Sequence, residues 1–286
     1  MLRLPFFPAG TPLPCGAWLI ADGSLRTDSF VMLAVLGIWR AWLMNRHGAA
    51  IVGAVYTIII VWPFSVLLYV PLGFAALMSR HFGLLKVLQW GCISTVFWAA
   101  SSTVVDSYFF GKLVLPAWQI VEYNVLGDSG GPELYGVEPF HFYLQNAALN
   151  FNLAFVLALV LPAALLCRRF LCTKILHKQA ADYGVMYLTP LYVWVAFFSS
   201  IAHKEERFLY PVYPLICLAA ACCLEAIFDI SVHLLSRCCT IGRASMLANS
   251  GRTMAIALIA VLSISRGAAL HFNYAAPLQV RERGLG

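Results

Sequence analysis

The chain has 286 residues, of which 61% are hydrophobic and only 11% are charged, and its formal net charge is +6. Soluble domains carry about 25% charged residues, so this composition excludes an ordinary soluble domain and indicates an integral membrane protein. The basic residues are scattered between apolar segments, which is typical of topology signals rather than of a nucleic-acid-binding surface. We therefore expect membrane lipid, and no nucleic acid, among its partners.

The order of apolar segments predicts an all-α, polytopic membrane protein with roughly six to seven transmembrane helices, at about 20 residues per span. Residues 1–28 are rich in proline and of mixed polarity, which predicts a loose leader. Residues 29–270 are predicted to form the membrane domain, and residues 271–286 a short polar tail belonging to a truncated lumenal region. The predicted spans are 29–44, 49–78, 87–105, 142–167, 183–202, 209–228 and 253–269.

Two regions of the chain differ from a simple series of membrane spans. The run 49–78 is longer than one span requires, so we expect it to tilt or to break at Pro63 or Pro71. The interval 106–141 is acidic and rich in aromatic side chains, which predicts a segment lying at the membrane interface. A loop carrying Arg237, Arg243 and Arg252 is predicted to precede the last span.

Charge alternates along the chain, and this alternation predicts the topology. Basic loops tend to face the cytosol, so we place residues 80–86, 168–178 and 237–252 there. The interval 106–141, the charged cluster that begins at residue 203, and the tail then share the opposite side. This arrangement brings Glu138 and the cluster to one face of the membrane, where they can form one site.

Engineered glycosylation acceptors or cysteine labels test this topology. We expect them to place residues 106–141 and 203–208 on one side of the membrane and residues 168–182 on the other, because the basic segments resist translocation. A result that exposes Asp128 and Lys174 to the same compartment contradicts the predicted topology.

Five consecutive charge-capable residues, 203–207, lie between two strongly apolar runs, 183–202 and 215–228. Ionisable groups at membrane depth usually line a cavity or pair with one another, and Lys204 and Arg207 have the chemistry to hold a phosphate. The following prolines, Pro211 and Pro214, are expected to start and kink the next helix. By chemistry alone, an ordinary juxtamembrane helix cap remains an equally good interpretation.

Three ordered motifs carry a resemblance to a known family. They are HKEERFLYPVYP at 203–214, VDSYFFGK at 105–112 and LYGVEP at 134–139, the last running on to Phe151-Asn152. Together they resemble the dolichyl-phosphate-mannose-dependent mannosyltransferases of the endoplasmic reticulum, which have the GT-C architecture. The chain is most similar to the branch that forms alpha-1,2 linkages in the lipid-linked oligosaccharide. The resemblance implies a multi-pass protein of the endoplasmic reticulum membrane that transfers mannose, with inversion, from dolichyl-phosphate-mannose to a dolichol-linked glycan acceptor.

The resemblance also implies roles for particular side chains on the lumenal face. Glu206 and Glu138 are the candidate catalytic carboxylates, with Glu206 also keeping Arg207 oriented, although Glu138 at a helix start is an equally good structural interpretation. The candidate ligands of the donor phosphate are His203, Lys204 and Arg207. The candidate sugar or lipid contacts are Asp106, Tyr108, Tyr135 and Tyr210, where interfacial tyrosine is the alternative.

One departure from the family pattern bears on activity. Members of the family carry an adjacent acidic pair in their first lumenal loop, whereas Asp22 and Asp28 are separated here and lie in an unrelated context. We therefore expect the chain to be a fragment that is inactive on its own. A non-catalytic membrane fragment and a lipid-handling or transport protein remain alternatives. The sequence shows no constellation of metal ligands, so metal dependence stays open.

Overall fold

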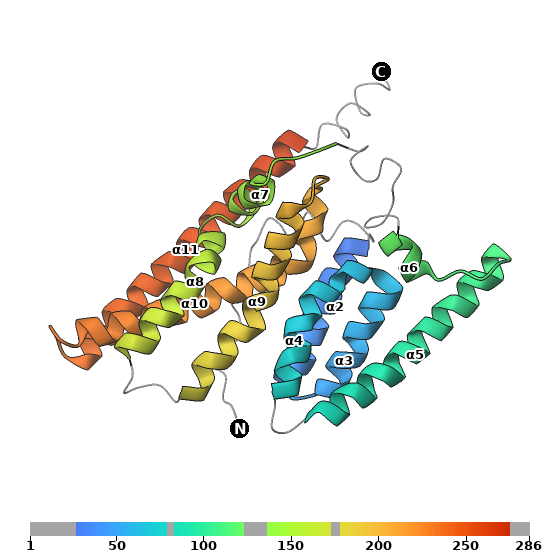
Figure 1. Ribbon diagram of the computed structural model, residues 1–286. Helices are drawn as coiled ribbons and strands as arrows, with labels where there is room; N and C mark the ends of the chain where they lie inside the picture. The colour runs from blue at the N-terminus through green and yellow to red at the C-terminus, as the bar shows by residue number, and fades with distance from the viewer. Residues whose placement is uncertain (1–26, 79–82, 123–135, 173–177, 275–286) are drawn as a thin grey trace, which may run out of the picture. The chain divides into compact units, whose positions relative to one another are not determined.

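The computed structural model describes residues 27–78, 83–122, 136–172 and 178–274, and every regular element in these ranges is a helix (Figure 1). This confirms the all-α prediction. The described residues divide into two compact units, which we call unit A (within 24–143 and 186–215) and unit B (within 144–185 and 216–286). The helices are α2 (Thr27–Leu43), α3 (His47–Tyr56), η1 (Thr57–Val61), η2 (Pro63–Ser65), α4 (Val66–Met78), α5 (Gly83–Phe110), α6 (Pro116–Val121), α7 (Phe142–Phe151), α8 (Leu153–Leu171), α9 (Lys178–Ser200), η5 (Glu206–Val212), α10 (Tyr213–Leu235) and α11 (Ile241–Tyr274).

Helix α2 opens unit A and begins at Thr27, so Thr27 and Asp28 belong to a helix and not to the predicted leader. Asp28 lies in the first turn, where a carboxylate is favoured by the helix dipole. Val31, Val35 and Ile38 recur at helical spacing and are buried. Helix α2 packs against α3 and against η5, the short helix that begins within the charged cluster. This packing brings the first turn of α2 into reach of the cluster.

The long apolar run 49–78 breaks at Pro63, as the sequence predicted. The helix widens into a π turn at η1, and Trp62 is then extended, with φ −156° and ψ 112°. A proline disfavours the helical conformation in the residue before it, and Pro63 starts the next, 3₁₀, turn. The second candidate, Pro71, lies inside α4, which continues through it.

Unit B differs from the predicted spans at two places. The span predicted at 142–167 is two helices, because Asn152 between α7 and α8 has a positive φ of 51°. The predicted loop around Arg243 and Arg252 is wrong, since both residues lie within α11. Arg252 pairs with Glu225 of α10 at 2.7 Å and stacks over Phe228, so its polar surroundings are provided by a neighbouring helix.

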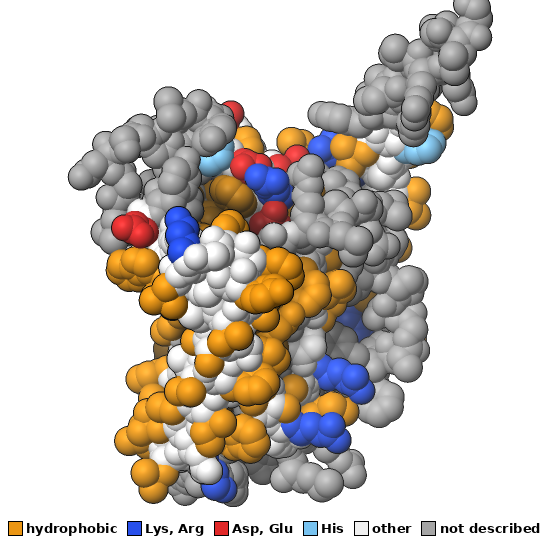
Figure 2. Space-filling model, turned by 90° about the vertical axis from the view of Figure 1, so that its right-hand side faces the viewer, with side chains coloured by type: hydrophobic (Ala, Val, Ile, Leu, Met, Phe, Trp, Pro, Cys, Tyr) orange, Lys and Arg blue, Asp and Glu red, His pale blue; other side chains and the backbone are white. Residues whose placement is uncertain are grey.

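Within the described residues, four helical segments are long and apolar enough to cross a membrane: Gly83–Phe110, Leu153–Leu171, Glu206–Leu235 and Ile241–Phe272. Three shorter apolar helices accompany them, at His47–Val61, Pro63–Leu77 and Leu188–Ser200. Hydrophobic side chains cover much of the outer surface of α5, as Figure 2 shows for the face on which it lies. A broad exposed apolar surface of this kind suits contact with lipid, and the helices agree with a polytopic membrane protein.

Candidate functional site

The charged cluster, residues 203–207, lies in unit A, in the connection that follows the end of α9 at Ser200 and in the first turn of η5, which starts at Glu206. Glu205 is extended, with φ −125° and ψ 143°, and its carbonyl accepts a hydrogen bond from the Phe208 amide at 3.1 Å. Pro211 lies within η5, and Pro214 in the first turn of α10. The prolines therefore mark the start of the next helix, as the sequence predicted.

Aromatic side chains hold the backbone of the charged cluster in place. The indole of Trp194, which is fully buried, donates a hydrogen bond to the Phe208 carbonyl at 2.7 Å. The Phe208 ring also lies 5.6 Å from Trp62 and 5.5 Å from Phe198, between ring centroids. Trp62 is the extended residue at the break before Pro63, so the predicted helix break supplies one wall of this aromatic support.

Lys204 ties the cluster to the segment around Glu138. Its side chain is buried, and its ammonium donates to the carbonyl oxygen of Glu138 at 2.7 Å and to that of Ile201. The Glu138 amide in turn donates to the Ala202 carbonyl at 3.1 Å. The structure thus brings Glu138 beside the cluster, as the sequence predicted. The Lys204 ammonium is therefore already hydrogen-bonded to backbone oxygen atoms.

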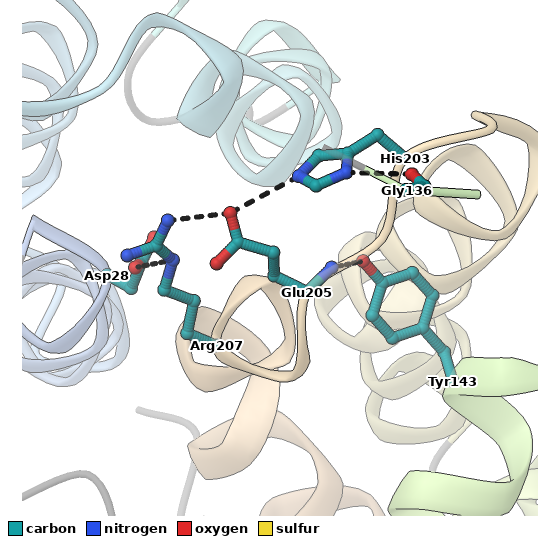
Figure 3. Close-up of polar contacts among 6 residues, drawn as sticks. All are labelled: Asp28, Gly136, Tyr143, His203, Glu205 and Arg207. Atoms are coloured by element: carbon teal, nitrogen blue, oxygen red, sulfur yellow. Dashed lines mark hydrogen bonds and ion pairs between the residues drawn. The ribbon is translucent and has the colours of Figure 1, made fainter. Parts of the chain in front are cut away.

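His203, Glu205, Arg207 and Asp28 form a continuous polar chain, shown in Figure 3. His203 Nδ1 lies 3.1 Å from the Gly136 carbonyl oxygen, and Nε2 lies 3.3 Å from Glu205 Oε1. The same carboxylate oxygen accepts a hydrogen bond from Arg207 Nη2 at 2.6 Å. Both ring nitrogens of His203 therefore face acceptors, and only the protonated imidazolium can donate to both at once.

Asp28 completes this chain and was missed by sequence reasoning. Its carboxylate lies 3.6 Å from Arg207 Nε, and its side chain is 9% exposed, against 35% for that of Arg207. The Thr27-Asp28-Ser29 stretch before an apolar run is a recognisable helix-start signal. That signal places Asp28 at the start of a helix, but nothing local indicates a partner at Arg207.

Two further features support the site from the backbone. The amide of Glu205 donates to the hydroxyl oxygen of Tyr143 at 3.2 Å, so Tyr143 is a second site residue that sequence reasoning missed. Gly136, whose carbonyl faces His203, has φ +104°, a conformation in which side-chain-bearing residues are strained. A glycine at this position therefore allows the carbonyl to meet the imidazole.

The structure also describes three further predicted site residues, Glu206, Tyr210 and Asp106. Glu206 is exposed at the start of η5, and the carboxylates of Glu205 and Asp28 lie beside Arg207, so the role of Glu206 in orienting Arg207 stays a prediction. Tyr210 is buried, with its ring 5.2 Å from that of Tyr213. Asp106 accepts a hydrogen bond from the Ser102 hydroxyl at 3.0 Å, near the end of α5.

Two other candidate sugar or lipid contacts are Tyr108 and Tyr135. Tyr108 is strongly exposed near the end of α5, and Tyr135 lies outside the described residues. Among the described residues, no group of three or more His, Cys, Asp or Glu side chains could hold a metal ion.

Comparison with known proteins gives one family and several relatives. The model of the Alg9-like mannosyltransferase family matches residues 17–283. The chain is 38% identical over 280 residues to the alpha-1,2-mannosyltransferase ALG9 of Mus musculus, covering 98% of this chain and 44% of the relative. It is 32% identical over 263 residues to ALG9 of Arabidopsis thaliana (91% and 43%), and 28% identical over 206 residues to GPI mannosyltransferase 3 of Candida albicans (70% and 37%). The chain thus spans less than half the length of these relatives, and no solved structure matches it.

Proposed function

The chain belongs to the Alg9-like mannosyltransferase family, and from this membership we propose that it forms the core of the membrane domain of an alpha-1,2-mannosyltransferase of the endoplasmic reticulum. The donor is dolichyl-phosphate-mannose, and the acceptor is a dolichol-linked oligosaccharide of N-glycan precursor assembly. In the reaction, an acceptor hydroxyl attacks the anomeric carbon of the mannose. The bond from that carbon to the phosphate oxygen breaks, dolichyl phosphate leaves, and a carboxylate takes the hydroxyl proton.

The observation that carries this proposal is the chain of contacts from Gly136 through His203, Glu205 and Arg207 to Asp28. Negative charge develops on the phosphate as mannose departs, and fixed donors stabilise such charge better than water that must reorient. Arg207 is held by two carboxylates while about a third of its side chain stays exposed. It is therefore both preorganised and accessible, and we assign it and His203 to the donor phosphate.

Lys204 takes a different role in this proposal. Its ammonium already donates to two carbonyl oxygens and its side chain is buried, so we propose that it positions the Glu138 segment against the cluster instead of binding phosphate directly. Glu138 and Glu206 are both exposed, and we assign them as the candidate proton acceptors. Asp106, Tyr108, Tyr135 and Tyr210 remain proposed sugar or lipid contacts.

A chimeric enzyme tests the proposed function. Residues 17–283 replace the matching segment of the mouse relative, and the chimera is expressed in cells that lack their own enzyme. We expect extension of the lipid-linked oligosaccharide, measured by chromatography of the glycans released from dolichol. The same chimera carrying His203→Ala and Arg207→Gln is expected to lose this extension, whereas one carrying Lys86→Gln, a change at an exposed lysine of α5, retains it. An abundant, correctly localised chimera that adds no mannose contradicts the proposal and favours a lipid-handling role.

A further inference from the structure

Unit B contains an arginine in an unusual place. Arg266 lies near the C-terminal end of the apolar run of α11, within the segment predicted to span the membrane. The predicted topology puts this end of the helix on the side opposite to the basic loops, so the positive-inside tendency does not account for it. Charged side chains at this depth are rare and usually pair or mark a functional site. Arg266 therefore needs an explanation of its own.

The contacts of Arg266 are made with a buried amide. Its Nε and Nη2 atoms both approach Asn150 Oδ1, at 3.4 and 3.3 Å. Asn150, on α7, is 1% exposed, and its amide nitrogen donates to Asn146 Oδ1 at 3.0 Å. The two long contacts share one neutral oxygen atom, which orients the guanidinium but supplies no counter-charge to it.

Two other arginines of unit B each have a carboxylate partner that balances their charge. Arg168 pairs with Asp229 at 2.7 Å, and Arg252 pairs with Glu225 at the same distance while also donating to Asn249. For Arg266, no carboxylate of the described part of the chain lies within ion-pair distance. A cation near the hydrocarbon region is costly without an anion, so an anionic ligand would stabilise Arg266 here.

The position of Arg266 indicates which class of anion fits. Arg266 lies within Ile241–Phe272, a segment long and apolar enough to cross a membrane. An anion that pairs with the guanidinium there comes from the membrane itself, so it carries an apolar portion. We propose that Arg266, oriented by Asn150, binds the phosphate of a membrane lipid. Arginine is suited to this because its planar fork can donate two parallel hydrogen bonds to phosphate oxygens.

Binding to the purified chain in a phosphate-free maltoside detergent tests this site without relying on mannosyl transfer. The probes are geranylgeranyl phosphate, dioleoyl phosphatidate and inorganic phosphate, with bound lipid measured by native mass spectrometry. We expect both lipids to bind and Arg266→Gln to weaken that binding by roughly tenfold or more, because a charge-assisted hydrogen bond is lost. Arg252→Gln is the matched control, since Arg252 also contacts an asparagine on α11 but is paired with Glu225. It should bind lipid like the unaltered chain.

A second variant separates a ligand site from a merely structural cross-link. Asn150→Asp supplies the missing carboxylate from within the chain, so it should lower lipid binding while keeping or raising the melting temperature. For the binding that Arg266→Gln removes, a tighter complex with geranylgeranyl phosphate than with phosphatidate assigns the site to isoprenoid lipids, and equal or weaker binding of geranylgeranyl phosphate assigns it to bulk phospholipid. The proposal is overturned if neither lipid binds, if inorganic phosphate binds as tightly as the lipids, or if either the Arg266 or the Asn150 variant binds lipid unchanged.

Discussion

Replacing Arg207 by lysine in the chimeric enzyme is expected to lower mannosyl transfer per molecule by about 10²–10³-fold, the typical cost of losing one preorganised donor at a site of developing charge. The guanidinium reaches Glu205 through Nη2 and Asp28 through Nε. A single ammonium cannot keep both carboxylates and still present donors to a phosphate. The effect should appear in the rate at saturating donor, since the proposed interaction strengthens as the phosphate leaves.

The measurement must distinguish a lower rate per enzyme molecule from a smaller amount of folded enzyme. Enzyme abundance by immunoblot and initial rates in isolated membranes are compared for Arg207→Lys, His203→Ala and Glu206→Gln, with Lys86→Gln as the control. If the cluster is only a helix cap, these variants lower the amount of protein while each surviving molecule turns over normally. Normal turnover in all three would remove the cluster from the proposed active site.

Replacing Lys204 by methionine is expected to destabilise unit A strongly. The methionine fills similar space but donates nothing, so the carbonyl oxygens of Glu138 and Ile201 lose their donor. A buried polar group without a partner costs about 1–3 kcal/mol, and the segment that carries Glu138 also loses its tie to the cluster. We therefore expect a lower melting temperature together with lost activity.

Thermal unfolding of the purified variant in detergent measures this effect, with Lys86→Met as the exposed matched control. Lys204→Arg serves as a second comparison, because it retains the charge but is too large for a buried site fitted to an ammonium. A Lys204→Met protein that melts like the unaltered chain but binds donor poorly contradicts the structural role. That result would support the prediction from the sequence that Lys204 binds the donor phosphate.

Local patterns in the sequence were sufficient for several features of this protein. The low charge content predicted a helical membrane protein, and the described residues are helical. Pro63 predicted the break in the long apolar run because a proline constrains its own backbone and that of its neighbour, whatever the rest of the fold does. Pro211 and Pro214 likewise mark the start of α10. The three ordered motifs led to the family that the comparison identified.

Only the tertiary structure decided which side chains meet. Asp28 reaches Arg207 because α2 packs against η5, and this contact joins residues far apart in the chain. Lys204 donates to backbone carbonyl oxygens, which every residue type possesses, so its partners leave no trace in the amino-acid sequence. The partners of Arg252, which are Glu225 and Phe228 of a neighbouring helix, were hidden from sequence reasoning in the same way. Residue type and spacing encode local backbone preferences and chemical capacity, whereas the partner of a charge depends on how distant helices pack.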